Sequence, residues 1–222
     1  MASGSEEGTE LETEDIDKSI RLTTDVELLK QAWRNEKASP EILKFQADLV
    51  QRSKEQIQLM EDTVEDYEGN GTDPLTISLY QMDLDRYQFL LRSYLRTRLQ
   101  KIEKYTIHIS KTEMWNRLSR PEQKFAKRCK DSMEKHLTQS VLSKLPEGYR
   151  SILQQSASSD AEDMVPEPQL DTFVFCKSNQ YREVVQVGES GDEQFDFAVD
   201  GLGVIRYTAI RELVETGKVD LV

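Results

Sequence analysis

Residues of the types that most often carry out catalysis are sparse in this chain, and their spacing does not suit a shared site. His108 and His136 are the only histidines, and Cys129 and Cys176 are the only cysteines. Cys129 and His136 lie seven residues apart in a segment with helical periodicity, which separates them by about 10 Å, too far for a nucleophile–base hydrogen bond. Neither histidine has a second histidine or a cysteine at the spacing of metal ligands. We therefore predict no catalytic residue and no metal site.

Motifs that bind phosphates or cofactors are also missing. The sequence contains no GxxxxGK[ST], GxGxxG, HExxH or GxSxG. Residues 201–203 (GLG) fall in an expected hairpin turn and do not precede a helix, so we do not expect a phosphate loop there. Acidic pairs such as Asp83 with Asp85, or Glu61 with Asp62, lie in highly charged helical segments and are typical of solvated faces. We therefore predict no cofactor and no enzymatic activity.

The charge and the apolar content exclude further classes of protein. The 222 residues include 29 Lys or Arg and 41 Asp or Glu, which gives a formal net charge of −12. A field of this sign repels phosphate, so we do not expect the chain to bind DNA by itself. No stretch approaches the roughly 18 apolar residues of a membrane helix, and the acidic start MASGSEEGTE lacks the apolar core of a secretory signal. With two cysteines only, we expect a cytosolic or nuclear protein with reduced thiols.

Residues 1–20 form an acidic tail for which two interpretations remain open. Residues 1–17 hold seven acidic side chains and no basic one, as a solvated tail would. Alternatively, residues 15–17 (DID) with Ile20 and Leu22 could form a short amphipathic segment that docks on a partner protein.

The elements that follow predict a mainly α-helical chain with a small β-rich second domain. Capping residues, prolines and glycines mark four helices, which we expect from Asp25 to about Lys37, from Pro40 to Gly69, from Pro74 to Tyr105 and from Ser119 to about Leu145. Short β-branched or aromatic runs separated by glycines follow at residues 172–176, 184–187, 195–199 and 204–207, then a short helix at 209–215 and a last strand at 219–222. We predict an acidic tail at 1–20, a helical bundle domain at 21–150, a flexible linker at 151–168 and a β-rich domain at 169–222.

The third helix carries apolar residues on two faces. On a projection at 100° per residue, Leu84, Leu91 and Ile102 share one face, whereas Met82 and Phe89 lie nearly opposite. A helix of this kind is either central in a bundle or shared with a partner. A β-rich domain of only about 50 residues buries little core, so we expect it to dock on its own helices or on another chain.

Arg98 projects onto the main apolar stripe of the third helix. Either its stem packs while its head reaches solvent, or it forms an ion pair with another helix or another subunit. Arg92 and Arg96 fall on a different, charged face near Asp85 and Glu103.

Four segments resemble the Sld-five-type subunit of the GINS complex. They are residues 29–43 (LKQAWRNEKASPEIL), 80–105 (YQMDLDRYQFLLRSYLRTRLQKIEKY), 170–176 (LDTFVFC) and 205–222 (IRYTAIRELVETGKVDLV). The resemblance implies a helical A domain followed by a β-rich B domain, in a nuclear heterotetramer with three other GINS subunits. It further implies that the tetramer joins the MCM ring and a RecJ-like partner, so that this chain is a scaffold that meets replication-fork DNA mainly indirectly. The candidate core or subunit-interface residues are Trp33, Tyr87, Leu91, Tyr94, Leu95, Arg98, Leu99, Ile102, Phe173, Phe175, Ile205, Tyr207 and Leu221.

Two other functions stay open at this point. One is a free-standing helical adaptor that binds peptide partners and should have a pocket. The other is direct DNA contact through the basic side chains of the third helix, which are Arg92, Arg96, Lys101 and Lys104.

Overall fold

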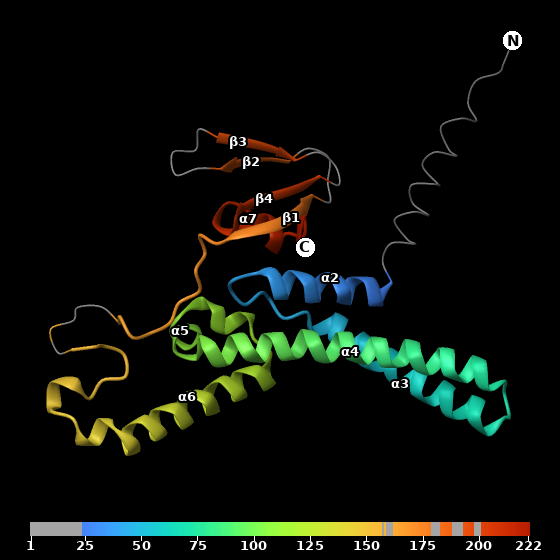
Figure 1. Ribbon diagram of the computed structural model, residues 1–222, viewed down its shortest axis with the longest axis horizontal. Coiled ribbons are helices and arrows are strands. Elements are labelled where there is room, and N and C mark those ends of the chain that lie inside the picture. Colours follow the sequence, from blue (N-terminus) through green and yellow to red (C-terminus); the bar gives the residue numbers. More distant parts are fainter. Residues whose placement is uncertain (1–23, 157, 159–161, 179–182, 188–192, 198–200) are drawn as a thin grey trace, which may run out of the picture. The chain divides into compact units, whose positions relative to one another are not determined.

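The computed structural model describes residues 24–156, 158, 162–178, 183–187, 193–197 and 201–222, and the predicted tail at 1–20 lies outside them (Figure 1). The predicted fold class, mainly helical with a small antiparallel sheet near the C-terminus, is confirmed. The main helices are α2 (Asp25–Ala38), α3 (Ala47–Gly69), α4 (Pro74–Lys104), α5 (Thr106–Lys111), α6 (Arg120–Ser140) and α7 (Tyr207–Glu215), and the strands are β1 (Phe173–Ser178), β2 (Glu183–Val187), β3 (Glu193–Phe197), β4 (Leu202–Arg206) and β5 (Val219–Leu221). Short 3-10 helices lie at η1 (Glu113–Arg117), η2 (Leu142–Lys144) and η3 (Glu147–Tyr149).

The described chain divides into two compact units. The first contains residues 24–33 and Gln46–Ser93, and the second contains Arg34–Phe45 and Tyr94–Val222. No helix among the described residues is long and apolar enough to cross a bilayer.

The first unit is built on an antiparallel helix pair. The turn between α3 and α4 contains Gly71 with a φ of +69°, a left-handed conformation that glycine adopts without strain. The rings of Tyr67 and Tyr80 meet edge to face at 5.1 Å, and Gln88 donates a hydrogen bond to Glu61 at 2.7 Å. Arg52 of α3 in turn donates to Asp25 at the start of α2 (2.9 Å), so three helix segments meet in this unit.

The second helix begins at Ala47, so the prediction that it begins at Pro40 was wrong. Residues 39–46 are not helical, and their backbone carbonyls serve as acceptors for cations. The carbonyl of Glu41 accepts from Lys101 at 2.8 Å, that of Ile42 from Arg117 at 3.1 Å, and that of Leu43 from Arg98 at 2.7 Å. These contacts compete successfully with the helix that Ser39-Pro40 would otherwise start. The third helix, by contrast, follows its predicted bounds almost to the residue.

Among its described residues, the second unit has two apolar cores. One gathers Ile42, Ile102 and Ile109 with the residues of η1 and α6 that pack against them. The other lies between the sheet β4-β1-β5 and α7, around Cys176 and Ile210, and Ala38 and Leu43 also pack against it. The last turn of α2 and the segment after it therefore pack against the core of the small sheet.

Each strand overlaps its predicted run, with differences at the ends. β4 begins at Leu202, so the expectation that residues 201–203 form a hairpin turn was wrong. Residues 198 and 199 of the predicted run 195–199 lie outside the described residues. β1 lies between β4 and β5 and is antiparallel to both, with Val174 opposite Ile205 and Cys176 opposite Leu221. β2 and β3 form a separate antiparallel pair. The helix α7 begins at Tyr207, two residues earlier than predicted. The Tyr207 amide, which has no acceptor within the helix, donates to the carbonyl of Thr172 at 3.0 Å.

Candidate functional site

The residues with catalytic potential are not brought together. His136 is exposed on α6, while Nδ1 of His108 lies 3.5 Å from the carboxylate of Glu167. Burial and the carboxylate of Glu103 both raise the pKa of Cys129, which disfavours its nucleophilic thiolate. No group of three or more His, Cys, Asp or Glu in the described part of the chain is placed to hold a metal ion.

The most specialised cluster in the described structure surrounds Arg98, whose side chain is completely buried. Nε donates to Glu122 at 2.7 Å and Nη2 to the second oxygen of the same carboxylate at 3.2 Å. Nη1 donates to Glu36 at 2.9 Å. The two remaining N–H groups donate to the carbonyls of Leu43 (2.7 Å) and Arg117 (3.2 Å), so all five guanidinium donors have partners.

Aromatic rings complete the environment of Arg98. The guanidinium carbon lies 5.3 Å from the ring centre of Phe45 and 5.8 Å from that of Tyr94, within the range of cation–π attraction. The carboxylates of Glu122 and Glu36 raise the pKa of Arg98 against the opposing effect of burial, so this side chain is permanently charged. The sequence left two interpretations open, a guanidinium that reaches solvent or one that forms an ion pair. The structure shows the second, with ion pairs to Glu36 and Glu122 of the same chain.

Local sequence explains why the two carboxylates are in place. Ser119 caps α6, and the Glu122 side chain accepts from the Ser119 amide at 2.7 Å, which is a capping box. The carboxylate of Glu122 thus caps the N-terminus of α6 and binds Arg98 at the same time. Glu36 lies in the last turn of α2, where it also accepts from Lys101 at 3.0 Å.

A third buried carboxylate, that of Glu41, connects the extended segment 39–46 to α7. It accepts two hydrogen bonds from Arg211, at 2.7 and 2.8 Å, and one from the Tyr207 hydroxyl at 3.0 Å. Arg117 lies 3.3 Å from the same carboxylate. Glu41 is fully buried, so its charge depends on these partners for its stabilisation.

Asn35 makes a third connection, to the last strand. Its side-chain oxygen accepts from the backbone amide of Leu221 at 2.7 Å, and its side-chain nitrogen donates to Asp220 at 3.2 Å. Residues 33–36 (WRNE), which lie in the family-like segment 29–43, therefore contain one residue that binds β5, Asn35, and one that binds Arg98, Glu36. Sequence reasoning missed both roles, and it also missed Glu41 and Glu122 as partners.

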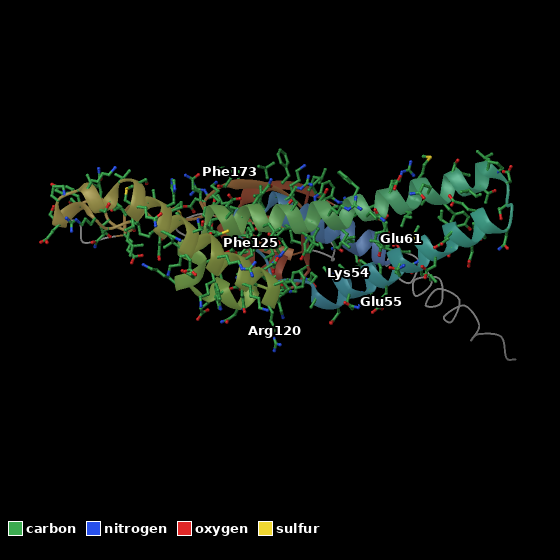
Figure 2. All side chains as sticks on the ribbon, turned by 90° about the horizontal axis from the view of Figure 1, so that it is seen from below. Lys54, Glu55, Glu61, Arg120, Phe125 and Phe173 are labelled. Atoms are coloured by element: carbon green, nitrogen blue, oxygen red, sulfur yellow. The ribbon has the colours of Figure 1, made fainter. Side chains whose placement is uncertain are left out.

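The outer face of the sheet is apolar and exposed. Phe173 and Phe175 of β1 point to the same side as Leu202 and Val204 of β4, and all four side chains are between 53% and 70% exposed. We call these four residues the sheet face. Arg206 lies at its edge, with its guanidinium carbon 5.6 Å from the ring centre of Phe173, which is labelled in Figure 2. An exposed apolar group of this kind is typical of a contact surface.

The predicted interface or core residues fall into three groups. The buried ones include both apolar side chains and Arg98, and the exposed ones include the two phenylalanines of the sheet face. Buried are Tyr87, Leu91, Tyr94, Arg98, Ile102, Ile205, Tyr207 and Leu221; partly exposed are Trp33 and Leu95; exposed are Leu99, Phe173 and Phe175.

The basic side chains of α4 do not form one exposed stripe. Lys101 is largely buried and donates to Glu36 and to the carbonyl of Glu41. Burial lowers the pKa of its amino group, although Glu36 partly offsets this. Arg92 and Arg96 are exposed, so at most part of the basic set postulated for DNA contact faces solvent.

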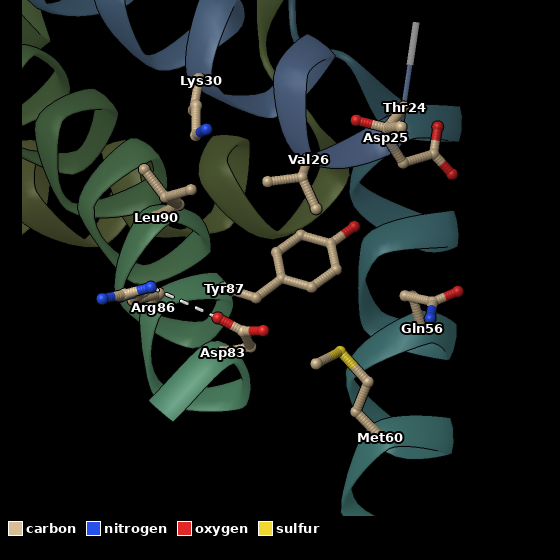
Figure 3. Close-up of a pocket in the computed structure, with 10 residues that line it drawn as sticks. All are labelled: Thr24, Asp25, Val26, Lys30, Gln56, Met60, Asp83, Arg86, Tyr87 and Leu90. Atoms are coloured by element: carbon tan, nitrogen blue, oxygen red, sulfur yellow. Dashed lines mark hydrogen bonds and ion pairs between the residues drawn. The ribbon is translucent and has the colours of Figure 1, made fainter. Parts of the chain in front are cut away.

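A hollow of about 590 Å³ lies in the first unit, between the start of α2, α3 and α4. Figure 3 shows the ring of Tyr87 between Val26 and Met60, with the ion pair of Asp83 and Arg86 at one side (3.3 Å). The lining therefore combines apolar side chains with charged ones.

These features define a class: a helical-bundle protein with a small C-terminal β domain, whose buried charges connect segments of the chain. Comparison with known proteins identifies the family within this class. The model of the GINS complex protein helical bundle domain matches residues 49–141, and that of the DNA replication complex GINS protein SLD5 C-terminus matches residues 168–222.

Similar proteins named DNA replication complex GINS protein SLD5 occur in distant eukaryotes. That of Arabidopsis thaliana is 52% identical over 225 residues and covers 100% of both chains. That of Mus musculus is 34% identical over 207 residues, or 89% of this chain and 88% of the relative. The Schizosaccharomyces pombe protein is 30% identical over 210 residues, or 93% and 96% of the two chains. The chain belongs to the SLD5 family of GINS complex proteins, as the resemblance of its segments predicted.

Proposed function

We propose that this chain is a non-catalytic scaffold subunit of a heterotetrameric GINS complex in the nucleus. In this role it binds three other GINS subunits. The tetramer then joins the MCM ring and a RecJ-like partner to form the active replicative helicase, and DNA unwinding is carried out by the MCM motor. Membership of a family of DNA replication complex proteins supports the proposal.

The observation that carries the proposal is the sheet face, with Phe173, Phe175, Leu202 and Val204 exposed together. Burying a large apolar side chain stabilises a contact by roughly 1.5–3 kcal/mol, so these residues favour a partner over water. A scaffold subunit binds its partners through exposed apolar surfaces of this kind, whereas on a protein that acts alone they promote aggregation.

The test is the solution mass of the chain, expressed alone and then together with the three other GINS subunits. Light scattering on a sizing column should show aggregation or self-association alone and a 1:1:1:1 particle after co-expression. Replacing Phe173 and Phe175 by serine should lower recovery of that particle, while Tyr149→Ser, at an exposed position outside the sheet face, should not. A folded monomer that ignores the other three subunits would refute the proposal.

The adaptor function has one observation in its favour, the hollow of about 590 Å³ beside Tyr87. Its mixed lining suits an amphipathic peptide. If the chain is a stable monomer, a peptide library should yield ligands whose binding is lost in Met60→Ala and Val26→Ala variants. A monomer that selects no peptide leaves this function without support.

Direct DNA contact has less support, because Lys101 is engaged by Glu36 and Glu41. The surface charges that remain for it are Arg92, Arg96 and Lys104. Binding that falls steeply between low and physiological salt, and that is lost in an Arg92→Ala, Arg96→Ala variant, would support this contact.

A further inference from the structure

The solvent side of α6 carries a row of basic side chains. Arg120, Lys124, Lys127, Arg128 and Lys135 are all exposed. On a projection at 100° per residue, these five positions lie within an arc of about 100°. We call them the α6 basic face. Figure 2 shows the first of them, Arg120, pointing outward from the ribbon.

The opposite side of α6 fixes the direction of this face. Ala126 is buried in the apolar core that contains Ile102, and Phe125 packs against the same core. Glu122 in the first turn of α6 binds Arg98. Because the helix is held along this inner side, the basic face points to solvent in a fixed orientation.

The side chains of the basic face have no counter-ion in the described part of the chain. The ion pair within α6 joins Lys130, which lies outside the face, to Glu134 at 3.9 Å. On α4, by contrast, the exposed Arg86 lies 3.3 Å from Asp83. Like charges three or four residues apart destabilise a helix, so an anion bound across the face would stabilise α6.

The chemistry of the face suits a phosphate backbone better than a protein. Apart from Pro121, every other exposed side chain of α6 is polar. Protein interfaces take most of their affinity from apolar and aromatic anchors, which this face lacks. A nucleic-acid backbone is bound mainly by lysine and arginine. From Arg120 to Lys135 the face is about 22 Å long, and a DNA strand has one phosphate per about 3.4 Å of helix axis, so the face passes about six phosphates.

The net charge of −12 does not prevent such a contact. Ions in solution screen exposed charges over about 8 Å at physiological ionic strength, so a phosphate beside α6 responds mainly to the nearest side chains. Within the arc of the basic face, Asp131 is the only acidic residue of α6. The local field at this face is therefore positive, although the charge of the whole chain is negative.

We propose that the α6 basic face binds the phosphate backbone of DNA through charge, without reading the base sequence. This inference goes beyond the proposed function, in which the chain meets DNA mainly indirectly. It also differs from a contact through Arg92 and Arg96, because those side chains belong to α4. A contact made through charge alone is weak and depends strongly on salt, and it accepts DNA of any sequence.

The experiment measures DNA binding by the full chain within the co-expressed tetramer, or by the chain alone if no tetramer forms. Fluorescence anisotropy of a labelled strand of about 20 nucleotides, and of its duplex, gives the affinity between about 50 and 200 mM salt. Wild-type chain should bind, with an affinity that falls steeply as the salt rises. Lys124→Glu combined with Lys127→Glu should weaken binding by about tenfold or more and lower the slope of log affinity against log salt by about two. The tighter of the two probes identifies the form of DNA that the face binds.

Two further variants separate the basic face from other effects. Arg92→Glu combined with Arg96→Glu makes the same change in charge on exposed side chains of α4, and it should leave DNA binding unchanged. Asp131→Lys extends the row of positive charges on α6. It should tighten binding by about threefold or more, a gain that misfolding does not produce.

The proposal is wrong if wild-type chain binds neither form of DNA at low salt, or if the variant at Lys124 and Lys127 binds as tightly as the wild type. A loss of binding only in the variant at Arg92 and Arg96 would place the contact on α4 and also overturn the proposal. A labelled glutamate peptide tests the other class of anion: if the face binds this peptide but no DNA, it is a protein-binding site and the proposal fails. The mass of the particle, measured for each variant, reports separately on the scaffold function.

Discussion

Replacing Arg98 by alanine is the sharpest test of the buried cluster. The change removes five hydrogen bonds and leaves the carboxylates of Glu36 and Glu122 buried without their main counter-ion. Breaking a buried ion pair from one side costs about 3–5 kcal/mol. For a chain of this size, each kcal/mol lowers the unfolding midpoint by about 2–4 °C. We therefore expect a fall of roughly 8–16 °C for a loss of about 4 kcal/mol.

The matched control is Arg92→Ala on the same helix. Arg92 is exposed and donates to Gln88 one turn away, at 2.6 Å. A surface change of this kind stays within about 0.5 kcal/mol, so the midpoint should move by no more than about 2 °C. Circular dichroism of the two variants during heating measures the difference. Recovery of the co-expressed tetramer should follow the same order, with Arg98→Ala well below Arg92→Ala.

Arg98→Lys separates charge from geometry. Lysine keeps the positive charge but has three donors on one nitrogen, which cannot reach Glu122 on two oxygens as well as Glu36 and two carbonyls. We expect it to lose about half as much stability as alanine. Full stability of Arg98→Lys would show that charge alone matters, and a midpoint of Arg98→Ala equal to that of Arg92→Ala would refute the buried cluster itself.

Four further predictions address other parts of the second unit. Glu41→Gln, which weakens charge-assisted hydrogen bonds to α7, should destabilise the chain by about 2 kcal/mol and speed amide hydrogen exchange in α7, while exchange in α3 stays unchanged. Burial raises the pKa of Cys176 to about 11, so at pH 8 iodoacetamide should modify Cys129 first, as mass spectrometry would show. Because the folded chain holds the Cys176 proton more tightly than the unfolded chain, stability from the neutral thiol is complete below about pH 9 and is lost towards pH 11, and Cys176→Ala should flatten this part of the pH profile of unfolding. Gly217→Ala should cost about 1 kcal/mol in denaturant unfolding, because Gly217 has a φ of +75°, whereas Gly69→Ala at the end of α3 should not destabilise the chain.

Most helix starts were predictable from the sequence because their signals are local, although α5 was not predicted and α6 ends at Ser140 and not near Leu145. The capping motif at Ser119 and Glu122 and the proline at the start of α4 both act within one turn, and both elements begin where these residues predict. The helix predicted from Pro40 failed for the opposite reason. The carbonyls after Pro40 accept hydrogen bonds from Arg98, Lys101 and Arg117, which lie 55 to 75 residues away. No local pattern contains that information.

The Arg98 cluster was predictable only in part, because its partners are also distant in the sequence. The projection of Arg98 onto the apolar stripe indicated that it needed a partner if buried, but helical periodicity does not say which carboxylates will be near it. The strand β1 shows a different limit. Phe173, Val174, Phe175 and Cys176 are all apolar, so the alternation of inward and outward side chains cannot be assigned from the pattern alone. The structure buries Val174 and Cys176 and exposes the two phenylalanines.

Five hydrogen bonds hold the buried charge of Arg98 on a stripe of α4 that is otherwise apolar. A methionine at this position would leave the carboxylates of Glu122 and Glu36 buried without Arg98, and Glu122 is fixed in place because it also caps α6. Each of the five donors of Arg98 meets an acceptor from α2, from the segment 39–46, from η1 or from α6, so only one arrangement of these segments satisfies all of them. Apolar contacts alone would tolerate sliding of one segment past another. We infer that the cluster fixes the position of the segment that carries Asn35 and Glu41, and through these two residues the position of the small sheet and its exposed face.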